Sequence, residues 1–214
     1  MKISYVVLTC ERYKDRLEAI RQTWGSSVEL LPLEDSLTDV AGYESCPYKY
    51  LEFFLKFEFS SDWYVFVDDD TYIHTNRLEE YLNNIPNSGC VTVGLYRNAN
   101  VPISEILLRG EFSGSSLNFP RGGAGFAVSL DGMKTIQNYL RNTERNKIPM
   151  ALNSDTSIAM WMDMAGPFNK VLEERFCRVY SPQEMIRFKY LSCHYVSPKQ
   201  MFEVHRRALN DDWR

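Results

Sequence analysis

Short apolar runs and helix-spaced apolar positions alternate along the first half of the chain. Residues 3–9 form a run rich in β-branched side chains, which is typical of a buried strand. In residues 10–24 the apolar side chains Leu17, Ile20 and Trp24 instead fall on one face of a helix. The same reasoning predicts further strands at 28–33, 63–67, 91–95 and 126–130, and further helices at 48–59, 77–82, 132–140, 154–164 and 198–208.

This alternation predicts an α/β fold with a mostly parallel central sheet flanked by helices. The stretch 97–120 is loop-rich with room for short strands, and the region from about residue 179 is irregular until the last helix. No linker-like stretch and no internal repeat divides the 214 residues, so a single domain over 1–214 is expected.

Composition and charge narrow the class of protein. With 44% hydrophobic and 24% charged residues the chain has an ordinary globular composition. A net charge of −4 argues against a nucleic-acid partner, which requires a basic face. The five cysteines are scattered without a CxxC pair, so neither a zinc cluster nor a full disulfide framework is indicated. The apolar run near the start is too short for a membrane segment or a signal peptide.

Three adjacent carboxylates follow the predicted strand at 63–67. Open α/β sheets bind ligands just beyond the carboxyl ends of their strands. Because alternate residues share a side, Asp68 and Asp70 can face one site, and three like charges in a row repel unless a cation compensates them. Carboxylate oxygens suit Mg²⁺ or Mn²⁺, so a divalent-metal site is predicted, with a solvated acidic turn as the alternative. The pattern does not fit aspartate-nucleophile phosphatases, because Thr71 follows Asp70 directly and the motif lies far from the N-terminus.

Three further features are ambiguous when each is taken alone. Residues 121–126 contain three glycines, which either let the backbone approach a ligand or form a tight turn before a strand. Asp155 opens the predicted helix at 154–164, either as an acid stabilised by the helix dipole or as a general base. His194, one of three histidines, is either structural or a third ligand for Mn²⁺.

Together, and in this order, these residues resemble glycosyltransferase family 31, which contains the fringe proteins and the core 1 β1,3-galactosyltransferases. Residues 16–24 are similar to the family's Arg…Thr-Trp motif, and 63–72 resemble its strand followed by Asp-Asp-Asp-Thr-Tyr. Residues 122–126 match its Gly-Gly-Ala-Gly-aromatic motif. Ser154 and Asp155 resemble its acidic pair, and 193–196 with Met201 resemble the tail of the core 1 enzymes.

The resemblance implies a GT-A fold and an inverting glycosyltransferase that uses a UDP-sugar donor and a divalent metal, usually Mn²⁺. It implies a β1,3 linkage to a glycan or glycosylated protein as acceptor. Carried over to this sequence, the metal ligands are Asp70, Asp68 and His194, and Asp155 is the catalytic base. The positions implied for the nucleotide and donor sugar are Asp68, Asp69, Gly123, Ala124, Thr9 and Arg12.

Two departures from the family pattern bear on these expectations. Ser154 stands where the first acid of the pair is usual, so Asp155 lacks an acidic neighbour. The membrane anchor and stem of the Golgi enzymes are missing from the sequence. A soluble bacterial or viral relative, cytoplasmic if Met1 is its native start, is one reading, and a Golgi-lumenal enzyme with its anchor trimmed is the other.

Two other functions remain open on the same residues. A metal-dependent UDP-sugar binding protein would keep the fold without catalysing transfer, although the acidic Asp155 argues against it. A sugar-nucleotide hydrolase or nucleotidyltransferase would use the same metal and diphosphate, with basic residues such as Arg97, Arg109 and Arg121 enlisted.

Overall fold

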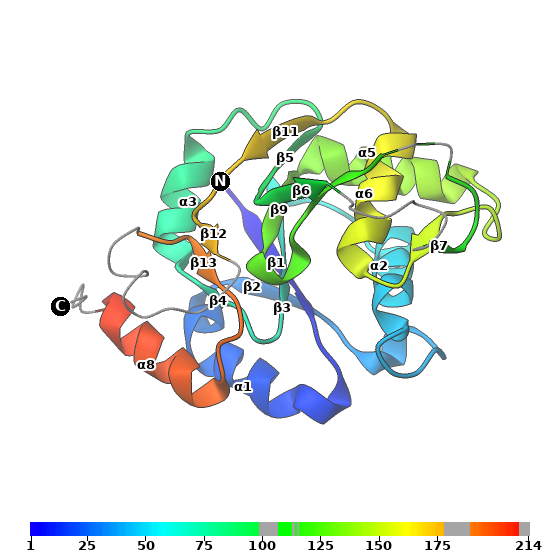
Figure 1. The fold of residues 1–214 in the computed structure, drawn as a ribbon. Coiled ribbons are helices and arrows are strands. Elements are labelled where there is room, and N and C mark those ends of the chain that lie inside the picture. The colour runs from blue at the N-terminus through cyan, green and yellow to red at the C-terminus, as the bar shows by residue number, and fades with distance from the viewer. Residues whose placement is uncertain (99–106, 113, 115, 178–188, 210–214) are drawn as a thin grey trace.

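A six-stranded sheet runs through the centre of the molecule (Figure 1). The computed structural model describes residues 1–98, 107–112, 114, 116–177 and 189–209. In spatial order the strands of this sheet are β11 (Asn169–Leu172), β5 (Val91–Gly94), β9 (Phe126–Ser129), β3 (Trp63–Asp68), β1 (Ile3–Leu8) and β2 (Glu29–Leu33).

The directions of these strands bring the predicted motifs together at one end of the central strands. β1 is parallel to β2 and β3, and β11 is parallel to β5, whereas β9 is antiparallel to both of its neighbours. Leu8 pairs with Asp68, so the carboxyl ends of β1 and β3 lie side by side. Because β9 runs the other way, the glycine-rich residues that precede it lie next to the end of β3. The sheet is therefore mostly parallel, as predicted.

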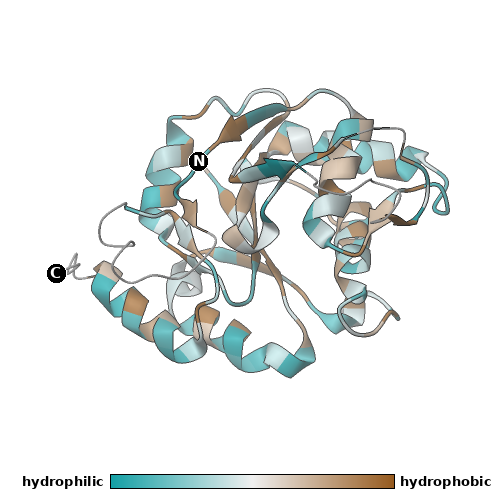
Figure 2. Cartoon of the chain, in the orientation of Figure 1, coloured by the Kyte–Doolittle hydropathy of each residue, from teal (hydrophilic) through white to brown (hydrophobic). Residues whose placement is uncertain are grey.

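Helices cover both faces of the sheet, as the alternation of apolar residues along its strands requires. Val6 and Phe66 pack on one face, while Tyr5 and Val65 pack on the other. The first face carries α2 (Ser45–Lys56), α5 (Leu130–Asn142) and α6 (Ser154–Ala165), and the second carries α1 (Lys14–Gln22), α3 (Thr75–Asn83) and α8 (Pro198–Leu209). In Figure 2 the central strands are mostly brown, and the outward turns of α1 and α8 are mostly teal.

The helices differ from the predicted ones mainly at their ends. The helix predicted at 10–24 is divided into η1 (Glu11–Tyr13), α1 and η2 (Trp24–Ser27). The helix predicted at 48–59 begins at Ser45 and ends at Lys56. Phe57 and Phe59, which continue its aromatic pattern, pack against Phe53 from the following loop. No helix in the described ranges is both long and apolar enough to span a membrane.

Short strands complete the fold, some of them in the stretch 97–120 where short strands were expected. A three-stranded sheet joins β12 (Phe176–Cys177), β13 (Ser192–Cys193) and β4 (Tyr72–Ile73), and therefore brings the C-terminal region beside the residues that follow β3. The loop-rich stretch 97–120 contributes to two small pairs, although 99–106, 113 and 115 lie outside the described residues. These pairs are β6 (Tyr96–Asn98) with β8 (Asn118–Pro120), and β7 (Leu107–Arg109) with β10 (Met150–Ala151). The irregular region predicted from residue 179 lies largely outside the description, up to residue 188.

Candidate active site

The acidic turn, residues 68–70, lies at the carboxyl end of β3. The turn is closed by a hydrogen bond from the Thr71 N–H to the Asp68 carbonyl, 3.1 Å long. Asp68 and Asp70 both approach His194, whereas Asp69 faces away toward Thr9. The alternation expected from strand geometry therefore holds through the turn, with two carboxylates on one side and one on the other.

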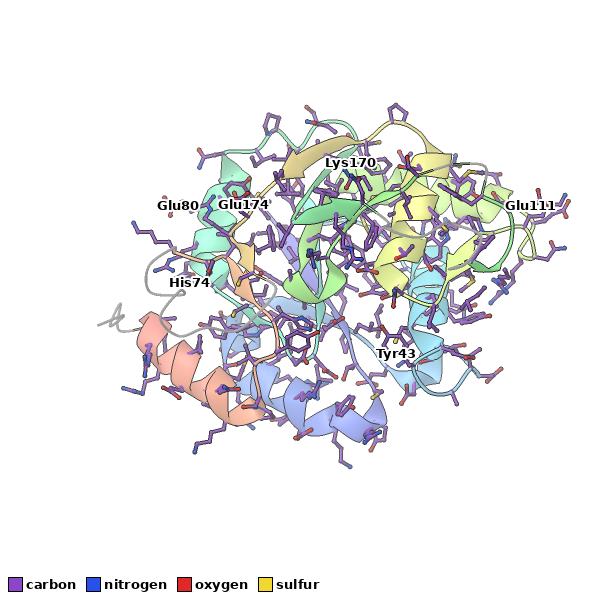
Figure 3. All side chains as sticks on the ribbon, in the orientation of Figure 1. Tyr43, His74, Glu80, Glu111, Lys170 and Glu174 are labelled. Carbon is purple, nitrogen blue, oxygen red and sulfur yellow. The ribbon has the colours of Figure 1, made fainter. Side chains whose placement is uncertain are left out.

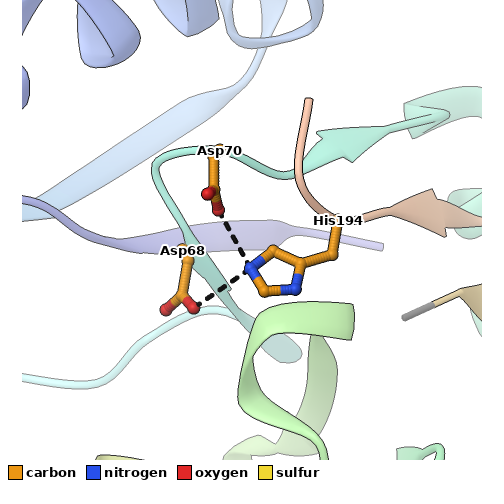
Figure 4. A group of neighbouring side chains, drawn as sticks. All are labelled: Asp68, Asp70 and His194. Atoms are coloured by element: carbon orange, nitrogen blue, oxygen red, sulfur yellow. Dashed lines mark ion pairs between the residues drawn. The ribbon is translucent and has the colours of Figure 1, made fainter. Parts of the chain in front are cut away.

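His194 reaches this turn from the far end of the chain. β13 pairs with β4, and the Val196 N–H donates to the Asp70 carbonyl at 2.8 Å, so the chain on both sides of the imidazole is anchored. His194 Nε2 lies 3.0 Å from Asp70 Oδ1 and 3.6 Å from Asp68 Oδ2 (Figure 4). The Tyr195 ring stacks on the imidazole with 3.8 Å between the ring centroids. The structure thus brings together the three residues that were expected to bind the metal.

Asp69 belongs to what we call the closed side of the turn, formed with Thr9, Arg16 and Lys49. The Thr9 hydroxyl donates to Asp69 Oδ2 at 2.9 Å, and Arg16 Nη1 donates to Asp69 Oδ1 at 3.1 Å. Arg16 Nη1 also donates to Asp70 Oδ2 at 3.2 Å. The buried Lys49 ammonium donates to the Thr9 carbonyl and to Asp35 Oδ1, each at 2.6 Å. Thr9 therefore lies at the site, where its hydroxyl binds Asp69.

The glycine-rich segment, which forms η4 (Gly122–Ala124), lies on the opposite side of the turn. We call this the open side, and it also contains Asp68 and His194. A Cβ added at Gly123 would overlap the His194 imidazole, so the ring lies directly against this backbone. The Thr71 hydroxyl donates to the Gly123 carbonyl at 2.8 Å and fixes the segment to the acidic turn. Gly125 has a φ of +87°, which a residue with a side chain rarely adopts. Two glycines are therefore explained, one by close packing and one by backbone conformation.

Asp155 lies at the start of α6 and is tied to the same glycine segment. Its Oδ2 accepts the Gly122 N–H at 3.1 Å, and its Oδ1 accepts the Thr156 N–H at 2.8 Å. Burial raises the pKa of Asp155, although these hydrogen bonds oppose the rise. Two consecutive glycines therefore lie between Asp155 and the cluster of Asp68, Asp70 and His194, with Gly122 next to Asp155 and Gly123 next to His194.

Two residues expected near the donor form no side-chain hydrogen bond or ion pair with the acidic turn among the described interactions. The exposed Arg12 side chain places its guanidinium over the Tyr13 ring, 5.5 Å from the centroid. Ala124 is buried, and its carbonyl accepts a hydrogen bond from the Ser192 hydroxyl. Their roles in donor binding stay predictions.

Sequence reasoning assigned no role to several residues that line the site. Arg16 was recognised only as part of a motif, and Lys49 carried no signal because its helix is apolar nearly all round. Tyr43, labelled in Figure 3, donates from its hydroxyl to Asn153 Oδ1 at 3.2 Å, just before Asp155.

The chemistry of the cluster fits a divalent cation. One ligand atom from each of Asp68, Asp70 and His194 can be chosen so that all three lie within 4.8 Å of one another. Two carboxylate oxygens and an imidazole nitrogen suit Mn²⁺. Burial raises the pKa of Asp68 to about 7, and the neighbouring carboxylates of Asp70 and Asp155 add to the rise, whereas His194 opposes it. A bound cation would relieve this repulsion.

Comparison with solved structures identifies the fold. The structure resembles a glycosyltransferase involved in the glycosylation of the major capsid of PBCV-1, with a TM-score of 0.52 and 12% identity over 96% of this chain and 99% of the other. The apo-form glycosyltransferase GlyE of Streptococcus pneumoniae TIGR4 gives a TM-score of 0.49 and 13% identity, over 99% of this chain and 63% of GlyE. The catalytic domain of Drosophila beta1,4galactosyltransferase 7 gives 0.40 and 13%, over 79% and 64%. No curated protein sequence matches the chain.

A mostly parallel sheet with an acidic turn at the end of a central strand is the arrangement of the GT-A glycosyltransferase fold, and this is the fold of the protein. The Fringe-like family model matches residues 43–164, which is more than half of the 214 residues. The chain therefore belongs to the Fringe-like family. Both the predicted fold class and the family resemblance are confirmed.

Proposed function

We propose that this glycosyltransferase is metal-dependent and inverting, and that it transfers a sugar from a UDP-sugar to an acceptor hydroxyl. The observation that carries the proposal is the cluster of Asp68, Asp70 and His194, whose ligand atoms lie within 4.8 Å of one another beside the glycine segment. These three residues would hold Mn²⁺, or Mg²⁺ in its place. A bound cation would offset the negative charge that develops on the UDP leaving group.

Asp155 is the general base in this proposal. The acceptor hydroxyl oxygen attacks the anomeric carbon while the bond between that carbon and the UDP oxygen breaks, and the hydroxyl proton passes to Asp155. Attack from the face opposite the leaving group inverts the anomeric configuration. The raised pKa of Asp155 supports this role, because a more basic carboxylate accepts a proton more readily.

The remaining assignments extend the same proposal to the donor and the acceptor. Gly123 and Ala124 would line the donor sugar, and Thr9, Arg12 and Asp69 would lie near the nucleotide. The expected product is a β1,3 linkage on a glycan or a glycosylated protein. Membership of the Fringe-like family supports this choice of acceptor class.

Calorimetric titration with UDP and a panel of UDP-sugars tests the proposal, with Mn²⁺ and with chelator. We expect binding to the wild type only when Mn²⁺ is present, and loss of that binding in Asp70→Ala. Asp15→Ala, which removes an exposed carboxylate from α1, serves as the matched control and should bind as the wild type does.

The outcomes separate the alternatives. If no UDP compound binds in the presence of Mn²⁺, the proposal is wrong. If the donor binds but is neither transferred to an acceptor nor hydrolysed, the protein is a UDP-sugar binding protein. If it is hydrolysed at the same rate with and without acceptor, the protein is a hydrolase.

A further inference from the structure

The middle carboxylate of the acidic turn has both of its oxygens bound by protein groups. Asp69 Oδ2 accepts from the Thr9 hydroxyl, and Asp69 Oδ1 accepts from Arg16. The Asp69 side chain is only 7% exposed. These two hydrogen bonds make Asp69 an anchor between β1, α1 and the turn.

The two carboxylate oxygens of Asp70 have different neighbours, and Arg16 binds one of them. The same Nη1 that donates to Asp69 also donates to Asp70 Oδ2 at 3.2 Å. The other oxygen, Oδ1, faces His194 Nε2 at 3.0 Å. The rotation of the Asp70 carboxylate is therefore fixed from the α1 side, and a single oxygen is presented to the cluster.

The segment that carries Arg16 is itself held firmly against the turn. The Arg16 guanidinium lies over the Tyr13 ring, 4.1 Å from its centroid. Beyond the other end of α1, Trp24 Nε1 donates to the Thr71 carbonyl at 3.1 Å. Arg16 in α1 and Trp24 in η2, the two ends of one sequence motif, thus both contact residues 69–71.

We infer that Arg16 is a positioning residue for the metal site: anchored on Asp69, it orients Asp70 so that only Oδ1 faces the cation. The inference rests on the proposed function for the presence of a metal. Groups that orient metal ligands through hydrogen bonds typically change metal affinity by about 10- to 100-fold. Simple electrostatics predicts the opposite, since removing a positive charge next to the cluster would strengthen the binding of a cation. Removal of Arg16 should therefore lower the Mn²⁺ affinity if Arg16 orients Asp70, and raise it if Arg16 acts only through its charge.

Titration of the full chain with Mn²⁺ alone, without nucleotide, shows whether the Mn²⁺ affinity falls or rises. We expect Arg16→Gln to weaken Mn²⁺ binding by about tenfold or more. Arg16→Lys should fall between the wild type and Arg16→Gln, because lysine keeps the charge and its N–H donors but is one bond shorter. Arg21→Gln, on the same helix and half-exposed with Glu18 and Glu34 as partners, is the control and should bind as the wild type does.

Two additional readouts separate positioning from loss of structure. The unfolding temperature in the presence of chelator shows whether each variant folds, and if Arg16→Gln does not fold, Arg16→Lys alone decides. In turnover assays a positioning role raises the Mn²⁺ concentration needed for half-maximal rate, while kcat at saturating Mn²⁺ returns toward the wild-type value.

The results that overturn the inference differ from those that overturn the proposed function. If the wild type binds Mn²⁺ and a folded Arg16 variant binds it equally well or more tightly, Arg16 is only a counter-ion and the inference is wrong. If the wild type itself binds no Mn²⁺, the metal dependence in the proposed function is wrong, and the inference is overturned with it.

Discussion

The two sides of the acidic turn place similar carboxylates in opposite surroundings. On the closed side Asp69 is buried between Thr9 and Arg16, with the Lys49 ammonium on the carbonyl of the same threonine. On the open side Asp68 remains 35% exposed, and its partner among the described ion pairs is the imidazole of His194. Burial raises the pKa of both aspartates, and neighbouring carboxylates reinforce the rise at both. Arg16 and Thr9 oppose it at Asp69, whereas His194 opposes it at Asp68.

This difference shows how the chain can fold with three adjacent carboxylates. Arg16 compensates Asp69 and one oxygen of Asp70 without any ligand. The charge that remains is concentrated on the open side, next to the glycine segment and Asp155. The fold thus supplies its own cation for one side of the turn and leaves the other side for a bound one. The following predictions change one side or the other.

The largest effect is expected from Asp155→Asn, which alters the open side without changing the metal ligands. Removing a general base typically costs about 10²- to 10⁴-fold in rate, so kcat should fall within this range. Binding of Mn²⁺ and of UDP should stay at wild-type levels, because asparagine is of similar size and keeps an oxygen that can accept from Thr156. Steady-state kinetics and calorimetry on the same preparation check both points. A loss in kcat below about tenfold would mean that another group accepts the proton.

The two consecutive glycines offer a matched pair of smaller effects. In Gly123→Ala the new methyl group would displace His194, so Mn²⁺ affinity should fall by about 10- to 100-fold. In Gly122→Ala the closest atom to the new Cβ is the Asp155 Cβ, at 3.0 Å. This variant should lose turnover but retain its Mn²⁺ affinity. Equal Mn²⁺ affinity in both variants would contradict the assignment of His194 as a ligand.

The smallest effect concerns the pH dependence of stability without metal. Because the pKa of Asp68 is raised to about 7 in the folded protein, against about 4 for an unfolded chain, the folded state binds the extra proton. The stability contributed by this group is therefore present below about pH 4 and is lost as the pH rises through about 7.

Unfolding temperatures in chelator at pH 5 and pH 8, for the wild type and Asp68→Asn, measure this contribution. Relative to the variant, the wild type should lose stability on going to pH 8, and Mn²⁺ in place of the chelator should restore it. Parallel pH profiles for the two proteins would show that Asp68 does not titrate in this range.

Much of the fold could be predicted because its signals are local. Five of the six central strands lie close to the predicted ranges, since each is an apolar run bounded by polar residues or turns. The edge strand β11 (Asn169–Leu172) was missed, because its short and partly polar sequence does not distinguish a strand from a loop. Strands of two residues, such as β4 and β13, depend on pairing with distant segments and leave no periodic pattern.

The site could be predicted only in part, for the same physical reason. Strand alternation anticipated that Asp68 and Asp70 face one side, because neighbouring residues determine it. The contacts of Arg16 with Asp69 and Asp70 span 53 and 54 residues, and spacing along the chain contains no information about them. The family motif that includes Arg16 marked the residue without revealing its partners.

The pairing of β13 with β4 also has a consequence for the order of folding. Asp68 and Asp70 are made early in synthesis, whereas His194 and its strand follow only after α6 and the segments beyond it. A growing chain therefore carries the acidic turn for a long time before the imidazole is available. The proposed metal site is complete only when this last strand has docked. A cation bound there would close a long loop between the acidic turn and the last strand, and would hold together two regions that lie far apart in sequence.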